Sequence, residues 1–223
     1  MSDAVFQILD ATRAHFHSPA QRDMWVELCA EDATPGMCGY LLKSMYGNRD
    51  AASNWEDFSR DVCAGKVGFT AGMGSSCLMY HRGRHVRLFK HGDDFILAGQ
   101  RADVEFLKKE LMKHIALKDK GRLGWNRHYG DLREVKILNR IVRLEGEVQN
   151  ASVEVEPDPR HVEVILRNLS LQMGSKGRLT PGESDKGELD LTPLVGGDVF
   201  LYRSTVMKAN YLAEDRYDVR FAV

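Results

Sequence analysis

The chain has 223 residues, a net charge of −1 and 43% hydrophobic residues, so it can bury a core in one or two domains. No apolar run approaches the roughly 20 residues that span a bilayer, and the N-terminus lacks the basic and apolar regions of a signal peptide. The sequence therefore predicts a soluble intracellular protein, cytoplasmic or nuclear, with no membrane partner.

The charge is distributed unevenly along the chain. Residues 82–143 contain sixteen Lys or Arg and eight Asp or Glu, a net charge of +8, whereas the rest of the chain carries −9. This basic stretch can attract a phosphate backbone. The alternative is that Lys108, Lys109 and Lys113 only form the solvated face of an amphipathic helix, which leaves four basic residues without an explanation. Those four are Arg82, Arg84, Arg87 and Lys90.

The first half of the chain predicts an alternation of strands and helices. A strand is expected at Val5–Asp10, followed by a helix over 50–64, where apolar residues recur at helical spacing. Two more strands are expected on either side of Gly83, and a third returns before a second helix. Their ranges are Leu78–His81, Val86–Lys90 and Phe95–Ala98. Asp103 is expected to cap the second helix, and Gly121 lies beyond its end.

This order of elements predicts the fold class. The sequence β, α, β, β, α matches an α+β fold, a split βαβ arrangement with both helices on one face of an antiparallel sheet. The opposite face of such a sheet is open to a ligand.

The second half of the chain predicts further, smaller elements. Val135–Arg143 and Val148–Val155 are expected to form a hairpin that turns at Glu145-Gly146. Asp158-Pro159 is expected to open a third helix, with the apolar residues Val162, Ile165, Leu166 and Leu169 facing inward. The stretch Met173–Gly197 is typical of a linker, and Phe200–Leu212 follows as an amphipathic segment.

An acidic pair marks the candidate site. Asp93 and Asp94 lie between two apolar runs, so a hairpin would carry both carboxylates at its tip, where they can share a divalent cation. Asp10 ends the first predicted strand, and carboxylates from separate elements suit a site for two metal ions. Taken alone, an Asp-Asp after Gly is more often a solvated turn.

Other side chains have simpler interpretations. Trp55 is expected in the core rather than as a platform for base stacking, because it belongs to an apolar stripe. His81, His85 and His91 lack a supporting Cys, which argues against zinc. The glycines near Ser75 are not followed by Lys-Ser/Thr, so a flexible turn is favoured over a phosphate loop.

The order of several motifs resembles the reverse transcriptase of Copia-type LTR retrotransposons, a part of a Pol polyprotein. The matching segments are LDATRAHFH at 9–17, MWVEL at 24–28, LLKSMYG at 41–47, Asn54-Trp55, Gly68-Phe69, CLMY at 77–80 and the Asp-Asp hairpin. Residues 106–121 resemble the helix and turn after the hairpin. YRSTV at 202–206, YLA at 211–213 and 218–223 resemble the segment that leads toward the RNase H domain.

The resemblance implies an RNA-directed DNA polymerase, a nucleotidyltransferase. Asp10, Asp93 and Asp94 would be the catalytic carboxylates that bind two Mg²⁺ ions, with Mn²⁺ as a substitute, and the backbone carbonyl of Ala11 would be a further ligand. Its partners would be an RNA template, a DNA primer and deoxynucleoside triphosphates, together with the fingers, RNase H and integrase parts of the polyprotein.

The resemblance also assigns residues to substrate binding. His15 takes the place of the aromatic gate against a ribose 2′-hydroxyl, and Gly47, Arg49 and Asp50 fall in the motif that lines the nucleotide and template pocket. His91 precedes the Asp pair, where the primer end would lie. Lys118 or Lys120 would lie near the pyrophosphate.

The resemblance implies four parts along the chain. These are a palm at 1–122, a hairpin and thumb-like helix at 123–172, a linker at 173–198 and the start of the connection toward RNase H at 199–223.

The departures from the family leave a second hypothesis open. His91-Gly92 replaces the usual Tyr-x, Asp50 replaces Gln and Ser53 replaces Arg. The fingers subdomain that precedes the first motif in the family is not expected in this sequence, and a poorly positioned nucleotide reacts slowly. The alternative is therefore a catalytically silent retroelement remnant that at most binds nucleic acid.

Overall fold

The computed structural model describes residues 3–172, 174–177 and 192–220. These residues fall into two compact units, one within 1–135 and 144–151 and the other within 136–143 and 152–223. In the described part of the chain, no helix is both long and apolar enough to cross a bilayer. The division into four parts expected from the sequence stays a prediction.

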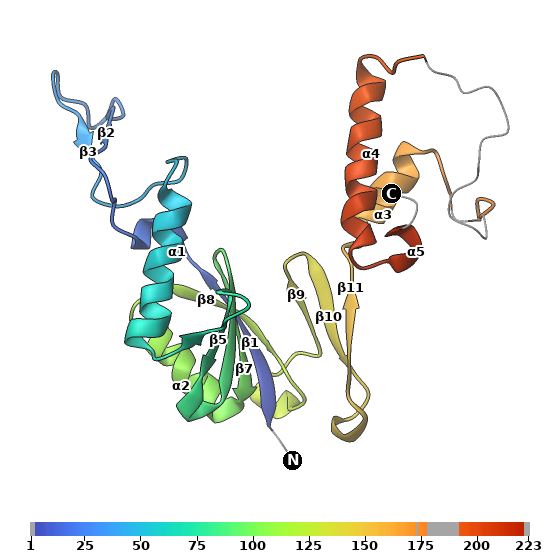
Figure 1. Cartoon of the computed structure of the whole chain (residues 1–223), viewed down its shortest axis with the longest axis horizontal. Helices are drawn as coiled ribbons and strands as arrows, with labels where there is room; N and C mark the ends of the chain where they lie inside the picture. The colour runs from blue at the N-terminus through green and yellow to red at the C-terminus, as the bar shows by residue number, and fades with distance from the viewer. Residues whose placement is uncertain (1–2, 173, 178–191, 221–223) are drawn as a thin grey trace. The chain divides into compact units, whose positions relative to one another are not determined.

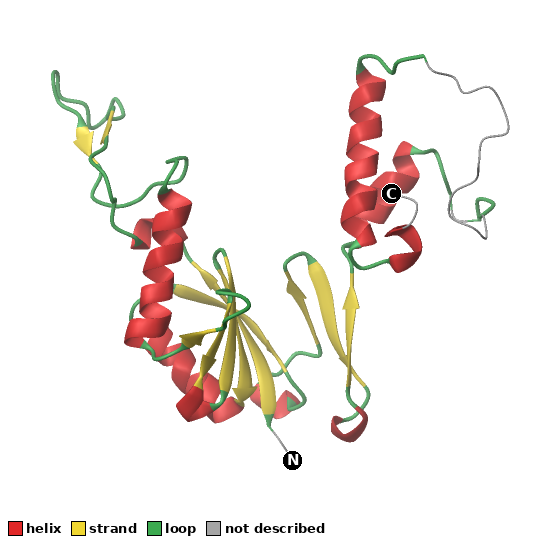
Figure 2. Cartoon of the chain, in the orientation of Figure 1, coloured by secondary structure: helices red, strands yellow, loops and turns green. Residues whose placement is uncertain are grey.

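The first unit contains a six-stranded antiparallel sheet, so the fold is α+β as predicted (Figure 2). The strand order is β4-β5-β6-β7-β1-β8. The strands are β1 (Ala4–Ala11), β4 (Thr70–Ala71), β5 (Leu78–His81), β6 (Val86–His91), β7 (Asp94–Gln100) and β8 (Leu117–Leu123). The four strands β8-β1-β7-β6 have the split βαβ order.

Both helices of this unit pack on one face of the sheet (Figure 1). They are α1 (Ala51–Asp61), which continues into a π-helical turn at Val62–Lys66, and α2 (Arg101–Met112). One buried cluster joins Trp55 and Leu107 on the helices to Leu9 and Phe95 on the sheet. Trp55 is a core residue, as predicted, with 3% of its surface exposed.

The alternation of side chains along β1 separates the two faces of the sheet. Val5, Leu9 and Ala11 belong to the core under the helices, whereas Asp10 lies between two of them in the sequence. Successive side chains of a strand point to opposite faces. Asp10 therefore points to the face that the helices leave open.

A short hairpin and a 3₁₀ turn complete the first unit beside α1. Strand β2 (Trp25–Val26) pairs with β3 (Gly39–Tyr40), and this hairpin lies beyond the N-terminal end of α1 (Figure 1). The 3₁₀ turn η1 (Ala14–His17) follows β1.

Two predictions about α2 and its surroundings need correction. The residue that caps α2 is Gln100 and not Asp103, whose carboxylate lies within the first turn and accepts a hydrogen bond from Arg84 Nη1 at 2.8 Å. Strand β8 is not among the elements predicted from the sequence, because its residues LKDKGRL are polar and do not alternate between apolar and polar side chains. Gly121 lies in this strand with φ +123°, beside a register shift in its pairing with β1.

Where the sequence predicts a second hairpin, the structure has a three-stranded sheet with the strand order β11-β10-β9. Its strands are β9 (Glu134–Ile137), β10 (Arg140–Glu145) and β11 (Ser152–Glu156). The predicted strand Val135–Arg143 is wrong as one element, because a turn at Leu138 and Asn139, both with positive φ, divides it. Leu rarely adopts this conformation, so Asn139 alone signals a turn at this position.

Three helices follow in the second unit, namely α3 (Pro159–Asn168), α4 (Gly197–Ala213) and α5 (Tyr217–Arg220). The predicted start of α3 is confirmed, since Asp158 Oδ1 accepts from Arg160 N at 3.1 Å and Pro159 takes the first helical position. Its predicted inward face is only partly confirmed. Val162 and Leu169 are exposed, and α3 buries no residue fully. Most of the predicted linker, 173 and 178–191, lies outside the described residues.

Candidate carboxylate site

Four of the predicted site residues form one row across the open face of the sheet. Asp10 on β1 pairs with Asp94 on β7, and it pairs on its other side with Lys118 on β8. Asp94 in turn pairs with His91 on β6. Directly opposed residues of antiparallel strands have their Cβ atoms about 5 Å apart on the same face. The fold therefore brings two acidic and two basic side chains together from four strands.

Asp93 lies in the turn between β6 and β7, which is anchored from two sides. The backbone N–H of Ala11 donates to the carbonyl oxygen of Asp93 at 2.7 Å, and Trp55 Nε1 donates to the carbonyl oxygen of Gly92 at 2.8 Å. Gly92 adopts φ +60°, which favours glycine. The core helix α1 and the end of β1 thus fix the position of the Asp pair.

The carboxylates repel one another. Partial burial, together with the charges of Asp93 and Asp10, raises the pKa of Asp94, while Lys120 and His91 act in the opposite direction. Lys120 Nζ lies 3.6 Å from Asp10 Oδ1. The site is therefore a cluster of negative charge that one nearby lysine offsets only in part.

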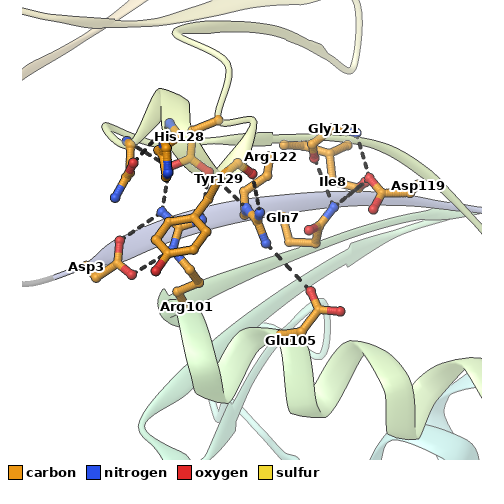
Figure 3. A network of polar contacts seen from close by, with 12 residues as sticks. Asp3, Gln7, Ile8, Arg101, Glu105, Asp119, Gly121, Arg122, His128 and Tyr129 are labelled. Carbon is orange, nitrogen blue, oxygen red and sulfur yellow. Dashed lines mark hydrogen bonds and ion pairs between the residues drawn. The ribbon is translucent and has the colours of Figure 1, made fainter.

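The position of Lys120 depends on a buried glutamine. Gln7, which is 1% exposed, donates through Nε2 to Asp119 Oδ1 at 2.7 Å and to the carbonyl oxygen of Gly121 at 3.0 Å. These two residues flank Lys120 in the irregular part of β8, so Gln7 holds the backbone that carries the lysine (Figure 3).

The carboxylate oxygens of this site suit a hard divalent cation, but the three carboxylates are not arranged around one point. Asp10, Asp93 and Asp94 offer only oxygen ligands, which Mg²⁺ prefers. Among the described residues, no group of three or more His, Cys, Asp or Glu side chains is arranged to hold a metal ion. The sheet pairing brings Asp10 and Asp94 together, and a third carboxylate held close to them would be repelled without a cation.

His15 stacks on a residue of the predicted nucleotide-pocket motif. Its ring lies 4.3 Å from that of Tyr46, centroid to centroid, and Arg13, which caps the 3₁₀ turn that contains His15, adopts φ 54°. Across the described ranges, two buried polar side-chain atoms have no hydrogen-bond partner, and these are Nδ1 of His15 and Nδ2 of Asn48. Both unsatisfied atoms belong to the two loops that the resemblance assigns to nucleotide binding, and buried polar atoms are normally paired.

The remaining predicted pocket residues lie just before α1. Gly47 adopts φ +91°, Arg49 is exposed, and the carboxylate of Asp50 accepts hydrogen bonds from Arg22 at 3.2 and 3.3 Å. The hydrogen bond from Arg22 lowers the pKa of Asp50. The structure thus uses the Asp50 side chain for an ion pair within the loops.

A second polar cluster, at the other end of β1, had no clear signal in the sequence. The side chain of Asp131 is fully buried and accepts hydrogen bonds from Arg101, Arg122 and the backbone N–H of Asn126 at 2.6 to 3.0 Å. Arg101 also binds Asp3 at the start of β1 (Figure 3). This cluster ties β1 to α2 and β8, and β1 and β8 also carry Asp10 and Lys118 of the carboxylate row.

Comparison with known proteins gives no identification. No protein-family model matches the chain, and no curated protein matches it either.

Proposed function

We propose that the first unit is the palm of an RNA-directed DNA polymerase of the Copia type, which transfers a nucleotide to a primer 3′-hydroxyl. The observation that carries this proposal is the row Lys118, Asp10, Asp94 and His91 on the open face of a split βαβ sheet. A sheet face with carboxylates at its centre and basic groups on both sides suits the meeting of a primer end with a triphosphate.

Asp10 and Asp94, with Asp93 beside them and the carbonyl of Ala11, would hold Mg²⁺ or Mn²⁺. The cations, when bound, lower the pKa of the primer hydroxyl and offset charge on the departing pyrophosphate. The carboxylates act as ligands and not as proton carriers. Burial and the charges of Asp93 and Asp10 raise the pKa of Asp94, and a cation held by these carboxylates would offset that repulsion.

The surrounding residues would position the substrates. The stacked rings of His15 and Tyr46 would limit the space beside the ribose, and the unpaired atoms of His15 and Asn48 would bind polar groups of the nucleotide. His91 would contact the primer end, and Lys118 would bind phosphate oxygens.

The wider assignments follow from this proposal. The second unit would contribute a thumb-like part and the start of a connection toward an RNase H domain, with fingers and integrase as other parts of a Pol polyprotein. RNA template, DNA primer and deoxynucleoside triphosphates meet in the cytoplasm or nucleus, which would be the location.

Primer extension on an RNA template tests the proposal. The chain is assayed with Mg²⁺, with Mn²⁺ and with chelator, both alone and joined to the fingers segment of a related polymerase placed before Met1. Cation-dependent addition of nucleotides to the primer is expected. A folded protein that adds no nucleotide in either form would refute the polymerase proposal.

A second candidate is nucleic-acid binding without catalysis. It is favoured by one observation, namely that no closed metal-binding trio occurs among the residues that the structure describes. Under this alternative, binding of RNA is expected to depend strongly on salt and to be the same in the wild type and in Asp94→Asn.

Replacing Lys120 with Met is expected to raise the affinity of the site for Mn²⁺ about thirtyfold, since unit charges 4 Å apart in water interact by about 1 kcal/mol and a divalent ion doubles this to about 2 kcal/mol. The ammonium group lies 3.6 Å from Asp10 Oδ1 and would repel an incoming cation. Calorimetric titration with Mn²⁺ measures the change. Lys109→Met, on the exposed side of α2, is the control, and an equal gain there would show a general charge effect.

A further inference from the structure

Four basic residues lie outside the solvated face of α2, namely Arg82, Arg84, Arg87 and Lys90. The structure gives a role to two of them. Lys90 is 1% exposed, and its Nζ binds Glu56 at 2.6 Å and Ser59 at 2.9 Å on α1. Arg84 binds Asp103 and lies over the ring of Phe106. Both are structural cations. No acidic side chain in the described ranges lies within ion-pair distance of Arg82 or Arg87.

Arg82 and Arg87 both line one groove of about 550 Å³ at the β4–β5 end of the sheet. Its other walls are largely apolar and include Thr70, Met73, Leu78 and Tyr80. Met73 is fully exposed and Leu78 is 53% exposed, so the apolar surface is open to solvent. The groove therefore combines two cations with an uncovered apolar and aromatic surface.

The groove opens on the same face as the carboxylate row. Thr70 pairs with Tyr80, and Tyr80 pairs with Arg87, so these three lie in one cross-strand row. Arg87 lies four residues before His91 on β6, and side chains an even number of positions apart share a face. Since neighbouring strands are about 4.8 Å apart, β5 lies roughly 10 Å from β7, which carries Asp94.

Aromatic side chains also line the sheet face between the groove and the carboxylate row. Phe89 pairs with Leu78 across the strands, and its ring stacks with that of His91 at 6.3 Å with an angle of 10°. The guanidinium of Arg87 lies 5.8 Å from the ring of Tyr80. Tyr80, Phe89 and His91 thus offer flat groups along one face, with guanidinium groups beside them.

The guanidinium groups and aromatic rings of the groove indicate which kind of ligand it can bind. Guanidinium groups bind phosphates in a bidentate manner, and exposed aromatic rings on a sheet stack with unpaired bases. A duplex hides its bases, and an extended peptide would need a long free edge, whereas β4 has only two residues. The combination fits a single strand of nucleic acid.

We propose that the groove formed by Tyr80, Arg82 and Arg87 binds single-stranded nucleic acid, as a site separate from the carboxylate row. Two or three nucleotides would lie with bases against Tyr80 and the apolar wall and with phosphates on the two arginines. The inference does not require catalysis, because it uses none of the carboxylates.

Fluorescence anisotropy with a labelled 12-nucleotide oligo(U) tests the proposal on the full chain. The double variant Arg82→Gln/Arg87→Gln is expected to bind at least tenfold more weakly, and its salt slope is expected to fall by about 1.4 because two phosphate contacts are lost. The matched control Lys109→Gln/Lys113→Gln removes the same charge from α2 and its C-cap, where both side chains are exposed, and is expected to stay within twofold.

Substitutions of Tyr80 test the contribution of base stacking to binding separately from that of charge. Tyr80→Leu is expected to weaken binding fivefold or more, while Tyr80→Phe keeps the ring and is expected to bind like the wild type. All side chains changed are at the surface or half-buried, and thermal unfolding checks that each variant is folded.

Three results would overturn the proposal. These are an equal loss of affinity in the α2 control, wild-type affinity in the arginine double variant, and competition by an acidic peptide or a duplex as effective as by the single strand. Asp94→Asn is included and is expected to bind normally. Primer extension by a protein whose groove variants bind normally would leave the polymerase proposal standing and refute only the groove.

Discussion

Replacing Asp94 with Asn is expected to lower cation-dependent nucleotide addition by about a thousandfold or more. Metal ligands contribute several kcal/mol of transition-state stabilisation, and each 1.36 kcal/mol is a factor of ten in rate. Asp94 faces Asp10 directly across β1 and β7, so the substitution would remove one of the two facing carboxylates of the proposed site. Single-nucleotide addition to an RNA-templated primer measures the loss.

The same variant is expected to be at least as stable as the wild type near neutral pH. The pKa of Asp94 is raised in the folded state, so ionisation of this group opposes folding above the unfolded pKa of about 3.9. Stability gained from Asp94→Asn should therefore be present at pH 7 and disappear as the pH falls below the unfolded pKa, where both states are protonated. Urea unfolding at pH 7 and pH 3 measures this difference.

Asp57→Asn is the matched control for both measurements. Asp57 is exposed on α1 and forms only a surface ion pair with Arg60, so its loss is expected to change neither addition nor stability appreciably. If the Asp94→Asn variant still added nucleotides like the wild type, the carboxylate row could not be the catalytic centre. A variant that is markedly less stable would instead show that Asp94 supports the fold.

Elements with strong periodicity could be predicted from the sequence. The strands around Asp10 and Asp94 and the helices α1 and α2 bury an apolar face, so their patterns reflect the core directly. The sequence does not predict strand β8, because its seven residues, LKDKGRL, are polar between two end leucines. The strand forms through backbone pairing with β1 and hydrogen bonds from Gln7. Its register, which brings Lys118 opposite Asp10, is a tertiary property.

The candidate site was predictable in composition and not in arrangement. The Asp pair and Asp10 stand out in the sequence, whereas the register that places Asp10 opposite Asp94 is seen only in the folded sheet. Partners far apart in sequence give no local signal. Arg101 and Asp131 are thirty residues apart, and Trp55 reaches Gly92 across thirty-seven. Only the folded chain shows that Arg84 and Lys90 are structural whereas Arg82 and Arg87 line a groove.

The buried carboxylate of Asp131 gives the largest expected effect on stability. Asp131→Ala is expected to destabilise the chain by about 3 kcal/mol, because removing one member of a buried ion pair leaves uncompensated charge. Arg101 and Arg122, with 12% and 19% of their side chains exposed, would both lose this partner. Typical domains have only about 5–15 kcal/mol of stability, so urea unfolding should show a clear shift.

Two controls separate the buried ion pair from its surroundings. Asp3→Asn removes the half-exposed partner of Arg101 and is expected to cost less than about 1 kcal/mol. Gly124→Ala places a Cβ atom 2.3 Å from Asp131 Oδ2, so it should be destabilising without any change of charge, whereas Gly74→Ala enters open space. Equal stability of Asp131→Ala and Asp3→Asn would show that the cluster is not a buried anchor.

The pH dependence gives an independent test of the same cluster. Burial of Asp131 disfavours its charge, but hydrogen bonds from Arg101, Asn126 and Arg122 outweigh this and hold its pKa at about 2. A folded pKa below the unfolded value of about 3.9 means that Asp131 stabilises the fold fully above pH 4 and less as the pH falls toward 2. Asp131→Ala should therefore lose its deficit relative to the wild type in acid. Urea unfolding of the wild type and of Asp131→Ala across this pH range measures the change.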